Sequence, residues 1–169
     1  MLICGEDLGN VPPEVPPVLA ELGILGLRIQ RWCDGRTWDY PNLCVAASSC
    51  HDCSPVRLWW NEEWGGAEGW YNYFVGQGPC PGGPPDWISQ KIIRMHFESS
   101  ALWTINPIQD YIDMWGSLRS QNPKNDMINR PGQTDGCWVW RCHKRMEDLI
   151  KEDAFNGFIA KNLKETGRG

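Results

Sequence analysis

The sequence has 169 residues, a length that suits one globular domain. Of these residues 41% are hydrophobic and 22% charged, a composition that argues against disorder. A net charge of −5 without a cluster of Lys and Arg argues against a nucleic-acid or anionic-membrane partner, because both require a concentrated basic surface. The 11 Trp residues favour contact with carbohydrate, since an indole ring stacks flat on a sugar, although most of them are expected in the core.

Neither a secretion signal nor a membrane span is predicted. The apolar residues 1–4 are followed at once by Gly5, Glu6 and Asp7, so the apolar region of a signal peptide is absent. The long uncharged run over 69–85 is interrupted by Gly and Pro and is shorter than the ~20 apolar residues of a span. We therefore expect a cytoplasmic protein whose 8 Cys residues are free thiols.

The first part of the chain predicts two strands joined by a helix. Residues 1–4 form a short apolar strand with no sequence before it, which suggests that something is missing upstream. A helix follows Pro12 and Pro13, because Pro suits a first helical turn and the apolar side chains up to residue 22 recur at helical spacing. Gly23 ends this helix. Residues 26–32 predict the second strand, and a loop follows over 34–41.

The alternation of strands and helices continues along the chain. Its expected elements are a strand over 43–47, a helix starting at Ser54 and Pro55, a loop over 76–85, a helix over 86–98, a strand over 101–105, and one or two helices between 145 and 167. Asp86 is the expected cap of the helix that it opens.

Buried strands that alternate with helices are typical of a parallel α/β sheet. Glu6, His51 and Asp52 directly follow strands, at the edge where a (β/α)₈ barrel carries its catalytic groups. A complete barrel needs ~250 residues. We therefore expect an α/β fold with about four βα units, half of a TIM barrel.

Glu6 and Asp52 are the first candidates for chemistry. Two carboxylates at strand ends of one sheet can face each other across a cleft, and glycoside chemistry uses one as proton donor and the other against positive charge. An acidic residue after a strand is equally typical of a cap or a turn, so that interpretation stays open. Asp7 is expected to be a capping residue.

Cys50 and Cys53 form a C-x₂-C pair. A zinc site would need further ligands from Cys137, Cys142 and His143. The spacing does not match a zinc finger, knuckle or ribbon, so we expect these thiols to behave as small apolar side chains.

Four blocks of sequence become specific when they are taken together. They are Gly5-Glu6-Asp7-Leu8-Gly9 with Val11-Pro12-Pro13-Glu14-Val15, Ser49-Cys50-His51-Asp52-Cys53-Ser54 with Trp59-Trp60, Trp103 with Pro107-Ile108-Gln109-Asp110, and Ile128-Asn129 with Pro131-Gly132 and Trp138-x-Trp140-Arg141. In this order they resemble the amylomaltase, or disproportionating-enzyme, family of 4-α-glucanotransferases. The second block has the form found in the plant cytosolic branch, and the resemblance runs from about residue 2 to 168.

The resemblance implies a retaining transglycosylase that moves α-1,4-glucan segments to acceptor glucans or glucose in starch, glycogen or maltodextrin metabolism. Glu6 matches the acid/base, Asp52 the carboxylate that stabilises the transition state, and His51 a neighbouring group that holds sugar hydroxyls. Trp32 falls near an aromatic of the acceptor region and Asn129 near a substrate-lining loop. The implied partners are α-1,4-glucans and maltooligosaccharides, and no cofactor or metal is implied.

The resemblance also implies that one essential carboxylate is missing, because the family's nucleophilic Asp lies on the strand before residue 1. Residues 1–169 are then the C-terminal half of a catalytic barrel, which needs the upstream half and is inactive alone. Two rival interpretations are a zinc-stabilised Cys/His interaction module and a non-catalytic, Trp-rich glucan-binding fragment.

Overall fold

The computed structural model of the chain describes residues 1–33, 36–62, 66–76 and 78–168. Within them lies a four-stranded parallel sheet with strand order β1-β2-β3-β4. The strands are β1 (Cys4–Gly5), β2 (Leu25–Ile29), β3 (Cys44–Ala47) and β4 (Trp103–Thr104). The predicted parallel α/β sheet is therefore confirmed, and each strand lies beside the next strand along the chain.

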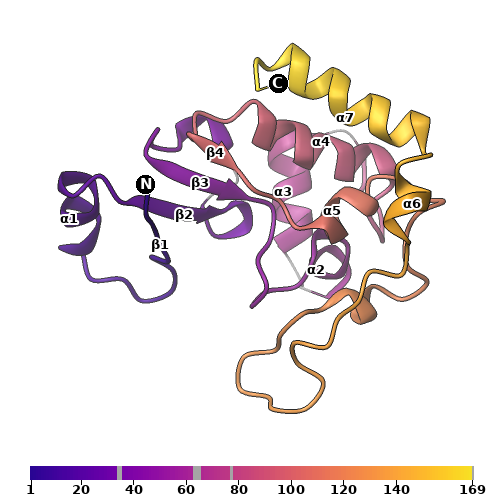
Figure 1. Cartoon of the computed structure of the whole chain (residues 1–169), viewed down its shortest axis with the longest axis horizontal. Coiled ribbons are helices and arrows are strands. Elements are labelled where there is room, and N and C mark those ends of the chain that lie inside the picture. Colours follow the sequence, from indigo (N-terminus) through magenta and orange to yellow (C-terminus); the bar gives the residue numbers. More distant parts are fainter. Residues whose placement is uncertain (34–35, 63–65, 77, 169) are drawn as a thin grey trace.

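Helices connect the strands and close the chain. They are α1 (Val15–Glu21), α2 (Val56–Glu62), α3 (Gly66–Phe74), α4 (Asp86–Phe97), α5 (Ile108–Ile112), α6 (Met146–Leu149) and α7 (Asp153–Glu165), with short 3₁₀ helices η1 (Gln30–Trp32), η2 (Thr37–Asp39) and η3 (Pro123–Asp126). Figure 1 shows α2 to α7 gathered on the side of β3 and β4, whereas α1 stands apart beside β1 and β2. No described helix is long and apolar enough to cross a membrane.

Two clusters of buried side chains form most of the core. The first joins α2, α3 and α4 through Val56, Trp59, Trp60, Ala67, Trp70, Tyr71, Ile88, Ile92 and Met95. The second joins α4, α5, α6 and α7 through Ile93, Phe97, Ile112, Met114, Leu118, Leu149 and Phe155. Both clusters lie among the helices, so the helical layer supplies much of the apolar burial that stabilises this fold.

The expectation that most Trp residues are core is wrong for the described part of the chain. Only Trp59, Trp60 and Trp70 are buried there. Five others are exposed, namely Trp32, Trp38, Trp87, Trp103 and Trp138. The three buried indole rings pack edge-to-face in the first cluster, whereas the five exposed ones lie outside both clusters.

The sequence placed several element boundaries differently from the structure. The second predicted strand ends at Ile29, because Gln30–Trp32 turns into η1. The strand predicted over 101–105 pairs only at Trp103–Thr104. Residues 34 and 35, the start of a predicted loop, lie outside the described residues.

Two further expectations concern helix termini and faces. Asp86 does not cap α4: Pro85 holds the N-cap position, and the Asp86 carboxylate instead accepts a hydrogen bond from the Gly116 amide at 2.9 Å. Helix α1 was correctly predicted, and Gly23 ends it with φ of 65°. None of its residues is buried, although its sequence carries an apolar stripe.

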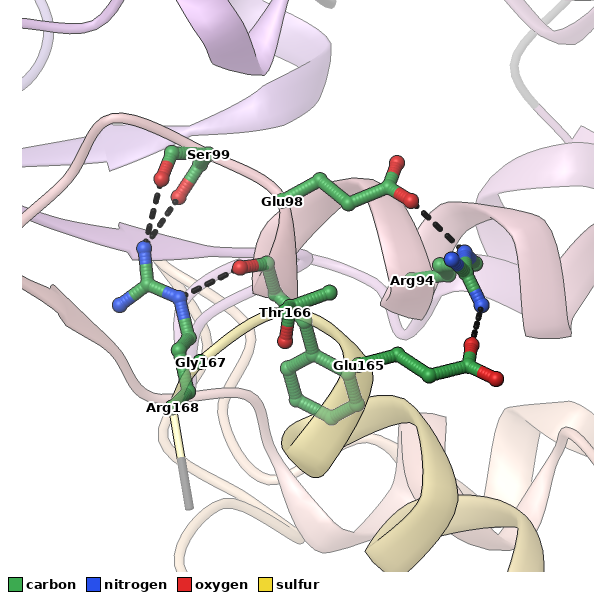
Figure 2. Close-up of a pocket in the computed structure, with 8 residues that line it drawn as sticks. Arg94, Glu98, Ser99, Glu165, Thr166, Gly167 and Arg168 are labelled. Atoms are coloured by element: carbon green, nitrogen blue, oxygen red, sulfur yellow. Dashed lines mark hydrogen bonds and ion pairs between the residues drawn. The ribbon is translucent and has the colours of Figure 1, made fainter.

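The end of α7 and the residues after it are held against α4 and the segment that follows α4 (Figure 2). The Arg168 guanidinium donates to the backbone oxygens of Phe97 at 2.5 Å and Ser99 at 2.7 Å. Arg94 pairs with Glu98 and with Glu165, both at 2.7 Å. These groups surround a pocket of about 450 Å³. Because Arg94 is paired with two carboxylates and Arg168 with backbone oxygens, we interpret this pocket as part of the contact between the C-terminal segment and α4.

Candidate active site

Glu6 and Asp52 both follow the carboxyl ends of parallel strands. Glu6 comes directly after β1, and Asp52 comes five residues after the end of β3. Only β2 separates these two strands, so neighbouring strand spacing of ~4.8 Å places β1 and β3 about 10 Å apart. The Glu6 side chain is exposed. The topology therefore brings both carboxylates to the same edge of the sheet.

Asp7 fixes the segment that carries Glu6. Its carboxylate accepts a hydrogen bond from the Leu27 amide of β2 at 2.7 Å and pairs with Arg28 at 2.7 Å. Asp7 thus ties the loop after β1 to the next strand and does not cap α1, contrary to expectation. Gly26 leaves room for this contact, because a Cβ atom at that position would lie 2.7 Å from Asp7 Oδ2.

Asp110, a buried residue of α5, anchors the segment between β3 and α2. Its Oδ2 accepts hydrogen bonds from the hydroxyls of Ser48 and Ser49, both at 2.6 Å. Its Oδ1 accepts a hydrogen bond from the Val56 amide at 2.8 Å, at the start of α2. One carboxylate therefore holds both ends of the turn that carries His51 and Asp52.

Asp52 lies at the centre of a small polar assembly. Asn129 Nδ2 donates to Asp52 Oδ1 at 2.5 Å, and His51 Nε2 lies 3.4 Å from Asp52 Oδ2. The backbone N–H of Asn129 also donates to the His51 backbone oxygen at 3.1 Å. Three predicted site residues, separated by up to 78 positions in sequence, are thus in direct contact.

The loop that carries Asn129 also supplies an aromatic ring. Trp138 packs against the His51 ring, with centroids 5.1 Å apart and planes tilted by 42°. Its amide donates to the Ile128 oxygen at 2.7 Å, which closes the loop at its base. Trp138 is the one non-glycine residue with positive φ in the described chain, at 62°. Such strain persists where surrounding contacts impose it, and it is typical of functional loops.

A pocket of about 560 Å³ opens beside Asp52. Its walls are formed by Trp32, Asp52, Cys53, Ser54, Leu58, Glu62, Lys124, Met127, Arg130 and Gln133. Trp32 is joined to this wall through its neighbour Arg31, which donates to the Ser54 hydroxyl at 2.8 Å and lies over the Trp59 ring. Trp32 and Asp52 therefore line the same pocket, and His51 and Asn129 adjoin it.

A buried charge cluster supports the far wall of the pocket. Arg57 of α2 lies 3.3 Å from Asp113 and donates to the Ser120 backbone oxygen at 2.9 Å. Arg57 also pairs with Asp126 of η3 at 3.5 Å. Burial raises the pKa of the Asp113 carboxyl to about 7, and the nearby Arg57 charge offsets this effect only in part.

The residues that a zinc site would require, Cys137, Cys142 and His143, contact other groups and do not surround a common point with Cys50 and Cys53. His143 Nε2 lies 2.7 Å from the Leu118 backbone oxygen, and Cys142 packs against the second core cluster. Cys137 contacts carbonyl oxygens of its own loop. Among the residues that the structure describes, no three His, Cys, Asp or Glu side chains are placed to hold a metal ion.

The sequence reasoning missed three residues that position the site. Asp110 was noted only as part of a motif, and Trp138 only as a member of another. Asp7 was expected to cap a helix. An available signal for Asp7 and Trp138 was their presence in blocks that carry the candidates Glu6 and Asn129, whereas the block of Asp110 carries no candidate. The partner of each residue depends on packing between segments 20 to 87 positions apart, which the spacing of the motifs does not reveal.

Fold and site together define a class of protein: a parallel α/β protein with two carboxylates at the carboxyl edge of the sheet, of which Asp52 lines an open pocket together with Trp32. This arrangement suits chemistry on glycosides. The family model for 4-alpha-glucanotransferase matches residues 1–147. The chain belongs to this 4-alpha-glucanotransferase family.

Individual relatives agree with this assignment. The chain is 34% identical over 176 residues to the 4-alpha-glucanotransferase DPE2 of Oryza sativa subsp. japonica, covering 99% of the chain and 18% of that protein. It is 36% identical over 171 residues to the 4-alpha-glucanotransferase of Chlamydia caviae, covering 95% of the chain and 32% of that protein. The chain thus spans from about a fifth to a third of the length of these relatives.

Solved structures show the same fold. An amylomaltase from Streptococcus agalactiae, determined in complex with acarbose, superposes with a TM-score of 0.74 at 21% identity, covering 99% of this chain and 32% of that one. The amylomaltase from Corynebacterium glutamicum gives a TM-score of 0.69 at 17% identity, covering 95% and 28%.

Proposed function

We propose that this chain supplies the acid/base and the transition-state-stabilising carboxylate of a retaining 4-α-glucanotransferase. Glu6 protonates the departing glucan oxygen and later takes the proton from the acceptor hydroxyl. Asp52 faces the oxocarbenium-like sugar, where a fixed negative charge stabilises the transition state. The observation that carries the proposal is the contact between Asp52, His51 and Asn129 beside the pocket.

The geometry gives each neighbour of Asp52 a definite task. Asn129 holds Oδ1 by its hydrogen bond, so the carboxylate plane is fixed before substrate arrives. His51 is half-exposed and presents its ring beside Oδ2, where it reaches sugar hydroxyls. Trp32 contributes an exposed aromatic face at the pocket for an acceptor sugar. The donors and acceptors are α-1,4-glucans and maltooligosaccharides, and no cofactor takes part.

The sheet supports the proposal that residues 1–169 form the C-terminal half of a (β/α)₈ barrel. Four parallel strands leave β1 and β4 as edges, and an eight-stranded barrel has none. Apolar side chains are exposed beside both edges, with Ile3 54% and Ile105 60% accessible. In the complete protein the upstream strands cover these edges and contribute the nucleophilic Asp. We place this protein in the cytoplasm.

Joining the chain to upstream strands of a glucanotransferase tests the proposal. The joined protein is expected to convert maltotriose into glucose and longer glucans, measured by chromatography of the products. The chain alone is expected to give no transfer, because no other group replaces the nucleophile. In the joined protein, Glu6→Gln abolishes transfer while Glu14→Gln, an exposed control in the same segment, leaves it unchanged. Transfer by the chain alone, or full activity of Glu6→Gln, would contradict the proposal.

A further inference from the structure

Cys50 and Cys53 bracket the two residues at the centre of the candidate site. Their Sγ atoms lie 3.2 Å apart, so one thiol donates a hydrogen bond to the other. The Cys50 amide also donates to Cys53 Sγ at 3.0 Å, and the Cys53 amide donates to the Cys50 oxygen at 3.4 Å. The turn between these residues therefore already brings the two sulfurs into contact, about 1 Å short of the approach that a disulfide requires.

The two thiols differ in access and in ionisation. Cys50 is partly exposed, whereas Cys53 is 9% exposed and borders the pocket. The hydrogen bond from the Cys53 thiol lowers the pKa of Cys50 to about 6, with help from the Asp52 amide and the His51 charge. The same bond, together with burial, raises the pKa of Cys53. This lowered pKa favours the thiolate of Cys50, which is the form that attacks disulfides.

Three other cysteines, Cys4, Cys44 and Cys80, do not combine a lowered pKa with a neighbouring thiol. Burial raises the pKa of Cys44 to about 11, and that residue is 0% exposed. The pKa of Cys4 and the pKa of Cys80 are also raised. Cys50 is therefore set apart from these three thiols by its neighbour Cys53.

We propose that Cys50 and Cys53 are a reversible dithiol/disulfide pair whose oxidation moves Asp52 away from Asn129. The oxidant is a small disulfide such as oxidised glutathione. The Cys50 thiolate attacks one of its sulfurs, forms a mixed disulfide and releases one glutathione thiolate. Cys53 then attacks Cys50 Sγ and releases the second glutathione thiolate. The proton of Cys53, and the proton that Cys50 released to solvent when it ionised, go to the two glutathione thiolates, so two thiols are oxidised while one disulfide is reduced.

The structural consequence follows from distance. A disulfide holds its sulfurs ~2.05 Å apart, so the present 3.2 Å contact must shorten by about 1 Å. His51 and Asp52 lie between the two cysteines and move with them. Lengthening the 2.5 Å contact from Asn129 to Asp52 by about 1 Å takes it beyond the ~3.2 Å limit of an N–H···O hydrogen bond. If Asp52 has the role proposed above, a misplacement of this size lowers transfer by about 10²-fold.

Thiol mapping tests the pair without any assay of activity. The chain is equilibrated with reduced and oxidised glutathione in a series of ratios, quenched with acid, denatured, alkylated and digested with trypsin. Peptide 37–57 contains Cys44, Cys50 and Cys53, so Cys44 is an internal control. We expect Cys50 and Cys53 to lose alkylation together while Cys44 keeps it. In urea the pair should require more oxidised glutathione, because the folded turn is lost.

Variants separate the two steps. Cys53→Ser should accumulate a glutathione adduct on Cys50, and Cys80→Ser should behave as the unchanged chain. Equal oxidation in urea and in buffer, or alkylation retained at both positions, would overturn the pair. If Cys53→Ser is unfolded by circular dichroism, the comparison of native chain with urea decides alone.

The movement of Asp52 has its own readout. The side-chain amide resonances of Asn129 report the hydrogen bond to Asp52 by ¹H–¹⁵N NMR. Oxidation should shift them in the unchanged chain and leave them in place in Cys50→Ser. Resonances that stay fixed while the disulfide forms would overturn the displacement. Neither measurement depends on glucan transfer, so failure of the proposed function would be seen separately.

Discussion

Asn129 is the residue on which the position of Asp52 most directly depends. In a transglycosylase assembled with its upstream strands, Asn129→Ala is expected to lower kcat for maltotriose disproportionation by about 10- to 100-fold, because Asp52 loses the donor that fixes its carboxylate. Asn125→Ala removes an exposed amide from nearby η3 and should leave kcat unchanged. An unchanged kcat in Asn129→Ala, with the fold intact, would show that the hydrogen bond has no catalytic role.

Trp138 has a positive φ, and its ring packs against the His51 ring. Two substitutions separate the effect of the backbone strain from the effect of the ring contact. Trp138→Ala loses the ring and keeps the strained backbone, whereas Trp138→Gly loses the ring and relieves the strain. We therefore expect Trp138→Gly to be more stable than Trp138→Ala by about 1 kcal/mol, measured from urea unfolding of the chain. The opposite order would mean that the loop abandons this conformation once the ring is removed.

At the scale of elements, the contact between the loop after β1 and strand β2 depends on Gly26. Gly26→Ala places a methyl group 2.7 Å from Asp7 Oδ2 and displaces the Asp7–Arg28 pair. We expect a destabilisation of about 1–3 kcal/mol in urea unfolding, since overpacking has this typical size. Gly69→Ala is the matched control: it lies in α3 with nothing within 4 Å of the added carbon, and should stabilise the chain by up to about 1 kcal/mol. Equal effects of the two changes would show that the Asp7 contact is dispensable.

The elements also show where local sequence was sufficient. Residues 43–47 were predicted as a strand because their apolar run is continuous, and Cys44–Ala47 is buried throughout as β3. The short helices α5 and α6 are harder to foresee from local pattern. Both helices pack into the second core cluster with α4 and α7, and helices of four or five residues have little stability of their own.

At the scale of the whole molecule, the buried Asp113 carboxyl couples stability to pH. Its pKa is about 7 in the folded chain against 3.8 for an unperturbed group, so the folded state binds this proton more tightly. The resulting stabilisation is complete below about pH 4 and is lost as pH rises through 7, by up to about 1.4 kcal/mol per pH unit.

Asp113→Asn replaces this titrating carboxyl with a neutral amide and should therefore flatten the dependence of stability on pH. The difference in unfolding free energy between the unchanged chain and Asp113→Asn is expected to fall steadily from pH 4 to pH 7 and then level off. Urea unfolding at several pH values measures it. Asp39→Asn, an exposed carboxyl on η2, controls for general charge effects. A difference that does not vary with pH would mean that Asp113 stays ionised when folded.

The sequence by itself determined the class of fold and the family. Apolar runs of strand length, Pro and Gly at helix ends, and motifs in fixed order are local properties that survive without knowledge of contacts. Only the tertiary structure decided which side chains meet. It brought Asn129 to Asp52, Asp110 to the serines after β3, and Cys50 to within 3.2 Å of Cys53. It also decided that α1 and most described Trp residues stay outside the core, because burial depends on what packs against a residue and not on its own hydrophobicity.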